Sequence, residues 1–312
     1  MLNYQNEEYI TLDELKETVP SIFTKNGGPT TSEKYTHIPT DKVIKDMELL
    51  GWKVADAKEV AARTSDTKTF QKHLVVFRNP DISITSKMKN VKKDDTSPTG
   101  YRKSDGTFGP KDPTDVIWPQ ILLTNSHDGK NSFSFTAGLF RMICENGLVI
   151  STEEFADLKI RHMGYDFSTL QDTIKAIVEQ LPLTVESMSK MRDTELSEKN
   201  TLKLAKELLD IRVKDTKNQY EDSAINEVLI PQRAEDSGNG LWEVFNRIQE
   251  NIMEGNFQYK SNDNKLRYAR VIKNFKQDID LNKKMFSTAL TYAAKRNICP
   301  RKGAIFIITY QK

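Results

Sequence analysis

The sequence predicts an α+β fold, with an antiparallel sheet and helices in the first half of the chain and mainly helices in the second half. Three observations carry this prediction. Segments rich in β-branched and aromatic residues, or with apolar residues at alternate positions, gather between residues 72 and 137. After residue 165, apolar residues recur with the spacing of amphipathic helices. The apolar tail at residues 303–310 has strand composition again, and we expect it to return to the first sheet.

A helix is expected to open the folded core at Thr40. Its apolar side chains recur at i, i+4 and i+7 and so share one face: Val43, Met47 and Leu50. Gly51 ends the run, because glycine is the usual residue just past a helix end. A lead-in segment, residues 1–39, precedes this core and carries a short predicted helix at residues 12–18.

Extended segments and a long polar loop follow. Residues 52–54 start an extended segment, and KHLVVFR at residues 72–78 has the composition of a strand. Residues 86–115 form a loop by their proline and glycine content. Its candidate nucleic-acid-binding residues are Lys87, Lys89, Lys92, Lys93, Tyr101, Arg102 and Lys103. Two interpretations stay open: a surface on which single strands stack, or an ordinary solubilising loop.

The stretch from residue 118 to 151 is predicted to run as strand, turn, strand and helix. Residues 121–123 form a buried strand, and Asp128-Gly129 suits the positive φ angles of a tight hairpin. In residues 132–137, phenylalanine and alanine alternate with serine and threonine, so that one face is buried. Gly138 is expected to open a short helix with an inward face and a C-cap, formed by Leu139, Phe140, Ile143 and Asn146-Gly147.

The rest of the chain is predicted to be mainly helical. A capping box of Ser168 and Gln171 begins one helix that runs to Pro182, and Ser197 caps a second. A third is expected from its apolar stripe and from the glycine that stops it: Leu241, Phe245, Ile248, Ile252 and Gly255. Two further helices are expected at residues 266–275 and 281–295. The predicted parts are the lead-in 1–39, an α+β core 40–164 with the basic loop 86–115, and a mainly helical region 165–312 with a basic C-terminal part.

Composition excludes several classes of protein. Of the 312 residues, 37% are hydrophobic and 29% charged, which fits a folded protein with long polar loops. A run of about 18 apolar residues is absent, so we expect no membrane association, and the acidic, polar start is unlike a secretory signal. Cys144 and Cys299 are too far apart in sequence for a disulfide framework or a zinc knuckle. We expect a protein of the reducing cytoplasm, that of the host cell if a phage encodes it.

The sequence lacks the common signatures of catalysis. It has no phosphate-binding glycine-rich motif, no dinucleotide motif and no H-E-x-x-H. The histidines His37, His73, His127 and His162 are scattered along the sequence without metal-ligand spacing. His127 with Asp128 is either half of a catalytic or metal pair, or part of a turn in which Asp128 bonds its own backbone. Cys144 is either a nucleophile or a small packed residue, and we favour the structural interpretation. We therefore expect no catalytic residues, no metal and no cofactor.

Charge is distributed unevenly along the chain. The net charge is +2, yet residues 259–312 carry thirteen Lys/Arg against three Asp/Glu, which leaves 33 basic and 41 acidic residues in 1–258. The basic part is either a surface for a polyanion or a solvated helix face. Its candidate nucleic-acid-binding residues are Lys265, Arg267, Arg270 and Lys273, which would lie around one helix with Tyr259, Tyr268 and Phe275 interleaved.

Several motifs resemble those of the phage and plasmid-like proteins grouped as domain of unknown function 932. They are His127-Asp128-Gly129, Gly138-Leu139-Phe140-Arg141, Cys144-Glu145-Asn146-Gly147-Leu148, Arg161-His162, and Leu241 to Asn246 with Gln249-Glu250-Asn251. The resemblance implies a role in a phage or mobile element. The chain also resembles single-strand annealing proteins in the order of its elements, which is helix, Gly51-Trp52, strands and helix. This resemblance is an analogy of topology.

Three hypotheses follow. The first is a non-enzymatic protein that binds nucleic acid, with single-stranded DNA favoured, of an annealing or recombination type and able to form homo-oligomers. Arg141, Arg161 and His162 are further candidate binding residues, although Arg141 is equally placed to pair with Glu145 four residues on. The second is an anti-defence or host-takeover factor that binds a host or phage protein. The third is an enzyme with a site assembled around His127, Asp128 and His162.

Overall fold

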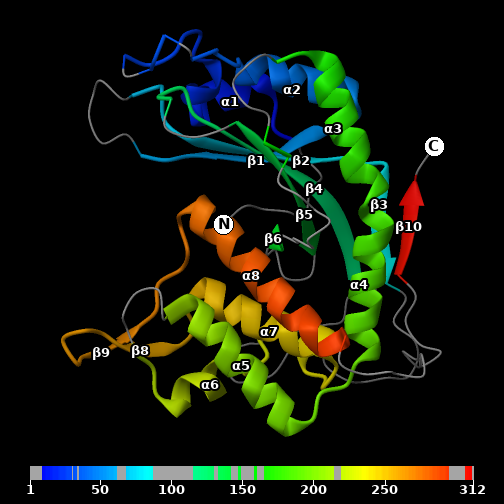
Figure 1. Ribbon diagram of the computed structural model, residues 1–312, viewed down its shortest axis with the longest axis vertical. Coiled ribbons are helices and arrows are strands. Elements are labelled where there is room, and N and C mark those ends of the chain that lie inside the picture. Colours follow the sequence, from blue (N-terminus) through cyan, green and yellow to red (C-terminus); the bar gives the residue numbers. More distant parts are fainter. Residues whose placement is uncertain are drawn as a thin grey trace.

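An antiparallel sheet lies between two groups of helices, and a small two-stranded hairpin projects from one of these groups (Figure 1). A computed structural model describes residues 9–29, 31–33, 35–61, 68–86, 115–129, 133–141, 147–148, 158–159, 165–213, 219–294 and 306–310. The predicted α+β class, with its antiparallel sheet and mainly helical C-terminal half, is confirmed.

The first half of the chain supplies most of the sheet. Its elements are α1 (Leu12–Thr18), the 3₁₀ helix η1 (Pro20–Phe23), α2 (Thr40–Leu49), β1 (Lys53–Glu59), β2 (His73–Arg78), β3 (Ile82–Ser86), β4 (Asp115–Asn125), β5 (Ser134–Arg141), β6 (Gly147–Leu148) and β7 (Leu158–Lys159). The second half contains α3 (Phe167–Glu179), α4 (Leu181–Asp193), α5 (Glu198–Val213), α6 (Asp222–Val228), η5 (Ala234–Asp236), α7 (Leu241–Glu254), β8 (Gln258–Lys260), β9 (Leu266–Tyr268), α8 (Phe275–Ala294) and β10 (Phe306–Tyr310).

The sheet is built around the long strand β4. Its order is β1-β2-β4-β3-β10, and β5 also pairs with β4 and carries the short strands β6 and β7. The last strand, β10, lies antiparallel to β3, with Phe306 opposite Ser86 and Tyr310 opposite Ile82. The predicted return of the C-terminal tail to the first sheet is therefore confirmed.

Both faces of the sheet are covered. On one face, α1, α2 and α3 bury the largest aromatic side chains of the N-terminal half, which are Trp52, Phe77, Phe133 and Phe135. On the other face, Leu74, Val76 and Leu122 pack against Phe275 and Ile279 of α8. A second large core lies among α4, α5, α6, α7 and α8, and the sheet contributes Ile84, Ile117 and Leu139 to it. Alternate residues of the strands are thus buried on opposite faces.

Several predicted helices are present where the periodicity placed them. The helix at residues 12–18 is α1, and the stripe of Val43 and Met47 is buried in α2. Ser197 caps α5, because its Oγ accepts the backbone N–H of Asn200 at 3.4 Å. Helix α7 ends at Gly255, whose φ of +81° is the left-handed conformation that glycine adopts readily.

The helix predicted to open at Gly138 is wrong. Gly138 lies inside β5, where it is opposite Gln120 of β4, and Leu139 and Phe140 continue the same ladder. Gly147 is not a helix cap, since it pairs with Phe140 as part of β6. The ladder with β4 provides partners for the backbone of this stretch, so tertiary pairing overrides its local helical pattern.

The helix predicted at residues 266–275 is also wrong. Residues 266–268 form β9, and irregular backbone leads from there to α8, which begins at Phe275. Asn264, at a φ of +61°, makes the tight turn that lets β9 fold back on β8. The basic residues of this segment therefore lie on a hairpin and a loop and do not surround a helix.

Other boundaries differ more modestly. Asp166, whose Oδ1 accepts the N–H of Thr169 at 2.8 Å, caps α3 in place of the predicted box of Ser168 and Gln171. Pro182 stands in the first turn of α4, a helix the sequence analysis did not predict, because the fixed φ of proline fits a helix start. Helix α6 and strand β3, of seven and five residues, were not predicted either.

A candidate nucleic-acid interface on the β8–β9 hairpin and helix α8

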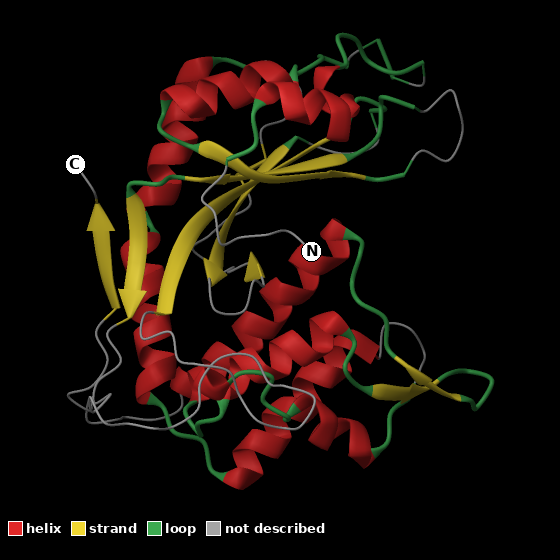
Figure 2. Cartoon of the chain, turned by 180° about the vertical axis from the view of Figure 1, so that it is seen from behind, coloured by secondary structure: helices red, strands yellow, loops and turns green. Residues whose placement is uncertain are grey.

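The β8–β9 hairpin stands apart from the main sheet (Figures 1 and 2). Gln258 pairs with Tyr268, and Lys260 pairs with Leu266. Near its turn the hairpin is held by Gln219, whose backbone N–H and carbonyl both bond to Lys260, at 2.9 and 2.6 Å. Two-stranded hairpins are only marginally stable in water, so the exposed strand β9 of this short hairpin invites a functional explanation.

Strand β9 and the loop after it expose apolar and aromatic side chains. All three residues of β9 are exposed. Tyr268 is 68% exposed, Leu266 54% and Val271 42%, so three of the most exposed large hydrophobic side chains lie within six residues. By contrast, Tyr259 packs against the helical core and Phe275 is buried, so of the three interleaved aromatics predicted from the sequence Tyr268 alone is exposed.

The predicted basic residues of this segment alternate along the chain with those exposed apolar residues. Lys265, Arg267, Arg270 and Lys273 are all exposed. Asp263 partly neutralises the hairpin tip, with its carboxylate 2.8 Å from Arg267 and 3.8 Å from Lys265. Hydrogen bonds from Ser261 and Arg267 hold the pKa of Asp263 below its usual value, so it is ionised at neutral pH. Arg270 and Lys273 lie farther along the chain, toward α8.

An open groove of about 260 Å³ continues from this loop, between the end of α5 and the first half of α8. Three cationic side chains line it: Arg212 from α5, and Lys276 and Lys284 from α8. Asn274, Gln277 and Asp280 add polar groups, and Ile211 and Leu281 add apolar ones. The groove is thus a polar, mainly basic surface of the kind that receives anions.

Two further interactions place cations around the start of α8. Arg212 donates a hydrogen bond from Nη2 to the backbone carbonyl of Arg270 at 3.0 Å, and burial lowers its pKa from the usual arginine value. The Nζ of Lys72 lies 4.8 Å from the centre of the Phe275 ring. Burial, and then the nearby charge of Lys276, lower the pKa of Lys72. Positive charge therefore lines the groove from α5 and α8, and Lys72, just before β2, adds a cation against Phe275 at the start of α8.

The remaining predicted binding residues are not brought to this surface by the described part of the chain. Arg141 ends β5, opposite Ile117 of β4 in the main sheet, whereas the hairpin is a separate two-stranded sheet. Nine others lie outside the described residues: Lys87, Lys89, Lys92, Lys93, Tyr101, Arg102, Lys103, Arg161 and His162. Arg212 was missed by sequence reasoning, because it lies in an ordinary amphipathic helix 58 residues before Arg270.

Three of the four histidines, although scattered along the sequence, meet in the structure. The ring centres of His37 and His127 are 4.6 Å apart, and those of His73 and His127 are 5.3 Å apart. Both ring nitrogens of His73 are in hydrogen bonds, with the Ser21 hydroxyl at 3.1 Å and the Thr40 hydroxyl at 2.9 Å. Burial lowers the pKa of His73 to about 4.

This histidine cluster joins the lead-in segment to the turn after β4. The carbonyl of His127 accepts the N–H of Gly28 at 2.6 Å, and its own N–H is donated to Phe70 at 3.3 Å. Asn125 donates to the Ile38 carbonyl and to the Thr40 hydroxyl. Among the described residues, no group of three or more His, Cys, Asp or Glu side chains is arranged to hold a metal ion. These contacts give the cluster a structural role.

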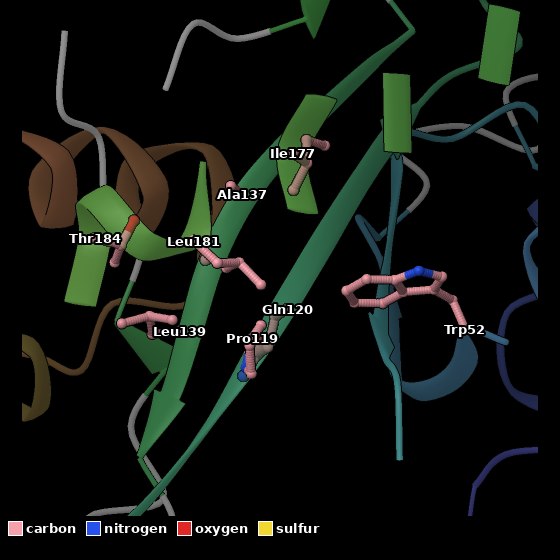
Figure 3. Close-up of a pocket in the computed structure, with 9 residues that line it drawn as sticks. Trp52, Pro119, Gln120, Ala137, Leu139, Ile177, Leu181 and Thr184 are labelled. Atoms are coloured by element: carbon pink, nitrogen blue, oxygen red, sulfur yellow. The ribbon is translucent and has the colours of Figure 1, made fainter. Parts of the chain in front are cut away.

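A second cavity is apolar and very small. It lies between the sheet and helices α3 and α4, and has a volume of about 10 Å³ (Figure 3). Its lining residues include Trp52, Gln120, Leu139, Ile177 and Leu181. A volume of this size holds about one water molecule and so does not accept an organic substrate.

The polar residues of α7 serve the fold. Asn251 is fully buried and donates to the carbonyls of Val228, Ile230 and Arg247, at 2.8 to 3.1 Å. Glu250 forms a buried ion pair with Arg233 at 2.9 Å. These bonds fasten the α6–α7 connection to α7, so the motif around residues 241–251 is explained by packing.

The fold and the surface together define an α+β protein with a projecting basic hairpin. The chain belongs to the family described as Domain of unknown function (DUF932), whose model matches residues 29–286. It is 26% identical to UPF0380 protein YafZ of Escherichia coli (strain K12) over 280 residues, which is 90% of each chain. It is also 26% identical to UPF0380 protein YfjQ of the same organism over 282 residues, covering 90% of this chain and 91% of the relative. No solved structure matches the chain. Within the described residues, no helix is long and apolar enough to cross a membrane.

Proposed function

We propose that this protein binds nucleic acid, preferentially single-stranded DNA, and does so without catalysing a reaction. The observation that carries the proposal is the exposed segment of the β8–β9 hairpin and the following loop, residues 258–276. It contains six Lys/Arg against one Asp/Glu, interleaved with Tyr268 at 68% exposure. Cations alone would bind any polyanion. The exposed aromatic ring favours a polyanion with unpaired bases, on which the ring can stack.

Single-stranded DNA offers both groups that this surface is suited to bind, which are phosphates and unpaired bases. Lysine and arginine neutralise phosphates and release condensed counterions, which makes binding strong at low salt and weak at high salt. Unpaired bases expose their faces, and an exposed tyrosine stacks on any of them. Duplex DNA hides its base faces, so it would bind through the cations alone. Leu266 and Val271 extend the apolar contact beside Tyr268.

The proposal is tested by fluorescence anisotropy with labelled single-stranded and double-stranded oligonucleotides at 50 and ~200 mM salt, a range over which several phosphate contacts produce large changes. We expect tighter binding of the single strand and a steep loss of affinity with salt. Changing Lys265, Arg267, Arg270 and Lys273 to Gln should abolish most binding and reduce the salt slope by about 3.

A matched variant controls for the loss of four charges. Lys16, Lys45, Lys175 and Lys190 are exposed on α1, α2, α3 and α4, away from the hairpin, and their change to Gln should leave binding nearly unchanged. If the wild-type protein binds neither oligonucleotide at low salt, the proposal fails. The exposed apolar residues of β9 would then point to a protein partner, which is the alternative function considered from the sequence.

A further inference from the structure

The groove between α5 and α8 contains cations that converge from separate parts of the chain. Lys276 and Lys284 are eight residues apart on α8, so they lie on one side of the helix about 12 Å apart along its axis. Arg212, at the end of α5, faces them across the groove. Asp280 is the one carboxylate among the groove-lining residues. Such a set of donors matches phosphate groups spaced along a chain.

Arg212 is the best-positioned donor in this groove. Its guanidinium is partly buried, and it donates to the Arg270 carbonyl at 3.0 Å. That bond restricts the side chain before any ligand arrives. A guanidinium has five N–H donors in a planar fork that matches two phosphate oxygens, so donors remain for a ligand. Restricting the side chain in advance lowers the entropy that binding must remove.

The start of α8 favours an anion at the same place, although its backbone does not bind one directly. The Oδ1 of Asn274 accepts the N–H groups of Lys276 and Gln277, at 3.0 and 3.2 Å. The contact groups are therefore side chains, while the positive end of the 20-residue helix adds a favourable field. Lys72 adds charge beside this turn, with its Nζ 4.8 Å from the centre of the Phe275 ring.

We infer that the α5–α8 groove is a phosphate-binding site in which Arg212 is the central donor and Lys276 and Lys284 are flanking donors. The biological ligand of this site rests on the proposed function. It would be the backbone phosphates of a single strand, one of whose bases stacks on Tyr268. The hydrogen bond between Arg212 and Arg270 joins the groove to the loop that follows the hairpin. Free pyrophosphate offers the same phosphate oxygens without bases. Testing both ligands therefore distinguishes binding of a free phosphate from binding of a nucleic-acid backbone.

The experiment measures direct binding of pyrophosphate by calorimetry, and binding of a 20-nucleotide oligo(dT) by anisotropy, to the full chain. Arg212→Gln should weaken both by about tenfold, because a charge-assisted hydrogen bond is lost. Asp280→Asn should strengthen both by about threefold, because a repelling charge leaves the groove. A misfolded variant does not gain affinity, so the second change guards against a folding artefact. Lys206→Gln, on the exposed side of α5, is the control and should change neither.

The outcomes separate the two proposals. If pyrophosphate binds and responds to both groove variants while oligo(dT) does not bind, the phosphate site stands and single-strand binding fails. If oligo(dT) binds and depends on the hairpin cations while Arg212→Gln and Asp280→Asn leave it unchanged, the groove inference is overturned and the proposed function stands. Absence of pyrophosphate binding, with oligo(dT) binding indifferent to Arg212, also overturns the inference.

Discussion

The guanidinium of Arg212 donates a hydrogen bond of 3.0 Å to the backbone carbonyl of Arg270. This bond ties the end of α5 to the loop between the β8–β9 hairpin and α8. Because the loop also carries Lys273, the tie orders two basic elements that are far apart in sequence. The bond therefore links a cation of α5 to the basic loop that follows the exposed Tyr268.

Tyr268 should contribute to binding and little to folding. We expect Tyr268→Ala to weaken single-strand binding by about 5- to 150-fold, which corresponds to roughly 1 to 3 kcal/mol of base stacking. The thermal midpoint should stay nearly constant, because the side chain is 68% exposed. Tyr268→Phe keeps the ring and should keep the affinity. Equal losses for the two variants would argue against stacking.

His73 should make the folded state sensitive to acid. Its pKa is about 4 in the folded protein, below the ordinary value of 6.5, because burial disfavours the charged ring. Below pH 6.5 the unfolded chain binds a proton that the folded protein binds only near pH 4. The free energy of unfolding should therefore fall as pH decreases through this window, by about 3 kcal/mol.

Urea unfolding at pH 7.5, 5.5 and 4.5 measures this effect, and His73→Gln removes the titrating ring. The variant is expected to be less stable at pH 7.5, since the Ser21 and Thr40 contacts change. Its stability should nevertheless depend less on pH between 6.5 and 4. An unchanged pH dependence in the variant would refute the role of His73.

Asp278 should act in the opposite direction. Burial raises its pKa to about 6 from an ordinary 3.8, while a hydrogen bond from Asn282 at 2.6 Å limits the rise. Between these values the folded protein holds a proton that the unfolded chain has lost, so stability falls as pH rises through the window. Asp278→Asn should raise the free energy of unfolding at pH 7.5, by at most about 3 kcal/mol, and change it little at pH 3.5. A variant that is destabilised at pH 7.5 would contradict this account.

Asn251 should prove essential for stability and neutral for binding. Its amide donates to three carbonyls, and its Oδ1 accepts from Gln232 and Asn256. Asn251→Ala leaves buried carbonyls without these donors and should lower the free energy of unfolding by about 3 kcal/mol. Asn239→Ala, at an exposed position, is the control. We expect the oligonucleotide affinity of folded Asn251→Ala to match the wild type, and a selective loss of affinity would assign α7 to the interface.

The sequence by itself determined the features that depend on neighbouring residues. The stripe of Phe245, Ile248 and Ile252 and the stop at Gly255 predicted α7, because helical periodicity and a left-handed glycine are local signals. Residues 72–78 predicted β2, and the C-terminal composition predicted β10, since β-branched and aromatic residues favour strands.

Tertiary structure decided the features that join distant segments. Gly138 is part of a strand because its backbone pairs with β4. The basic run at residues 265–273 forms one strand of a hairpin and the loop that follows it. Arg212 faces Arg270 across 58 residues, and His37, His73 and His127 come from three separate segments. Residues this far apart carry no shared periodicity, because the energy that brings them together comes from burying the sheet and the helices against each other.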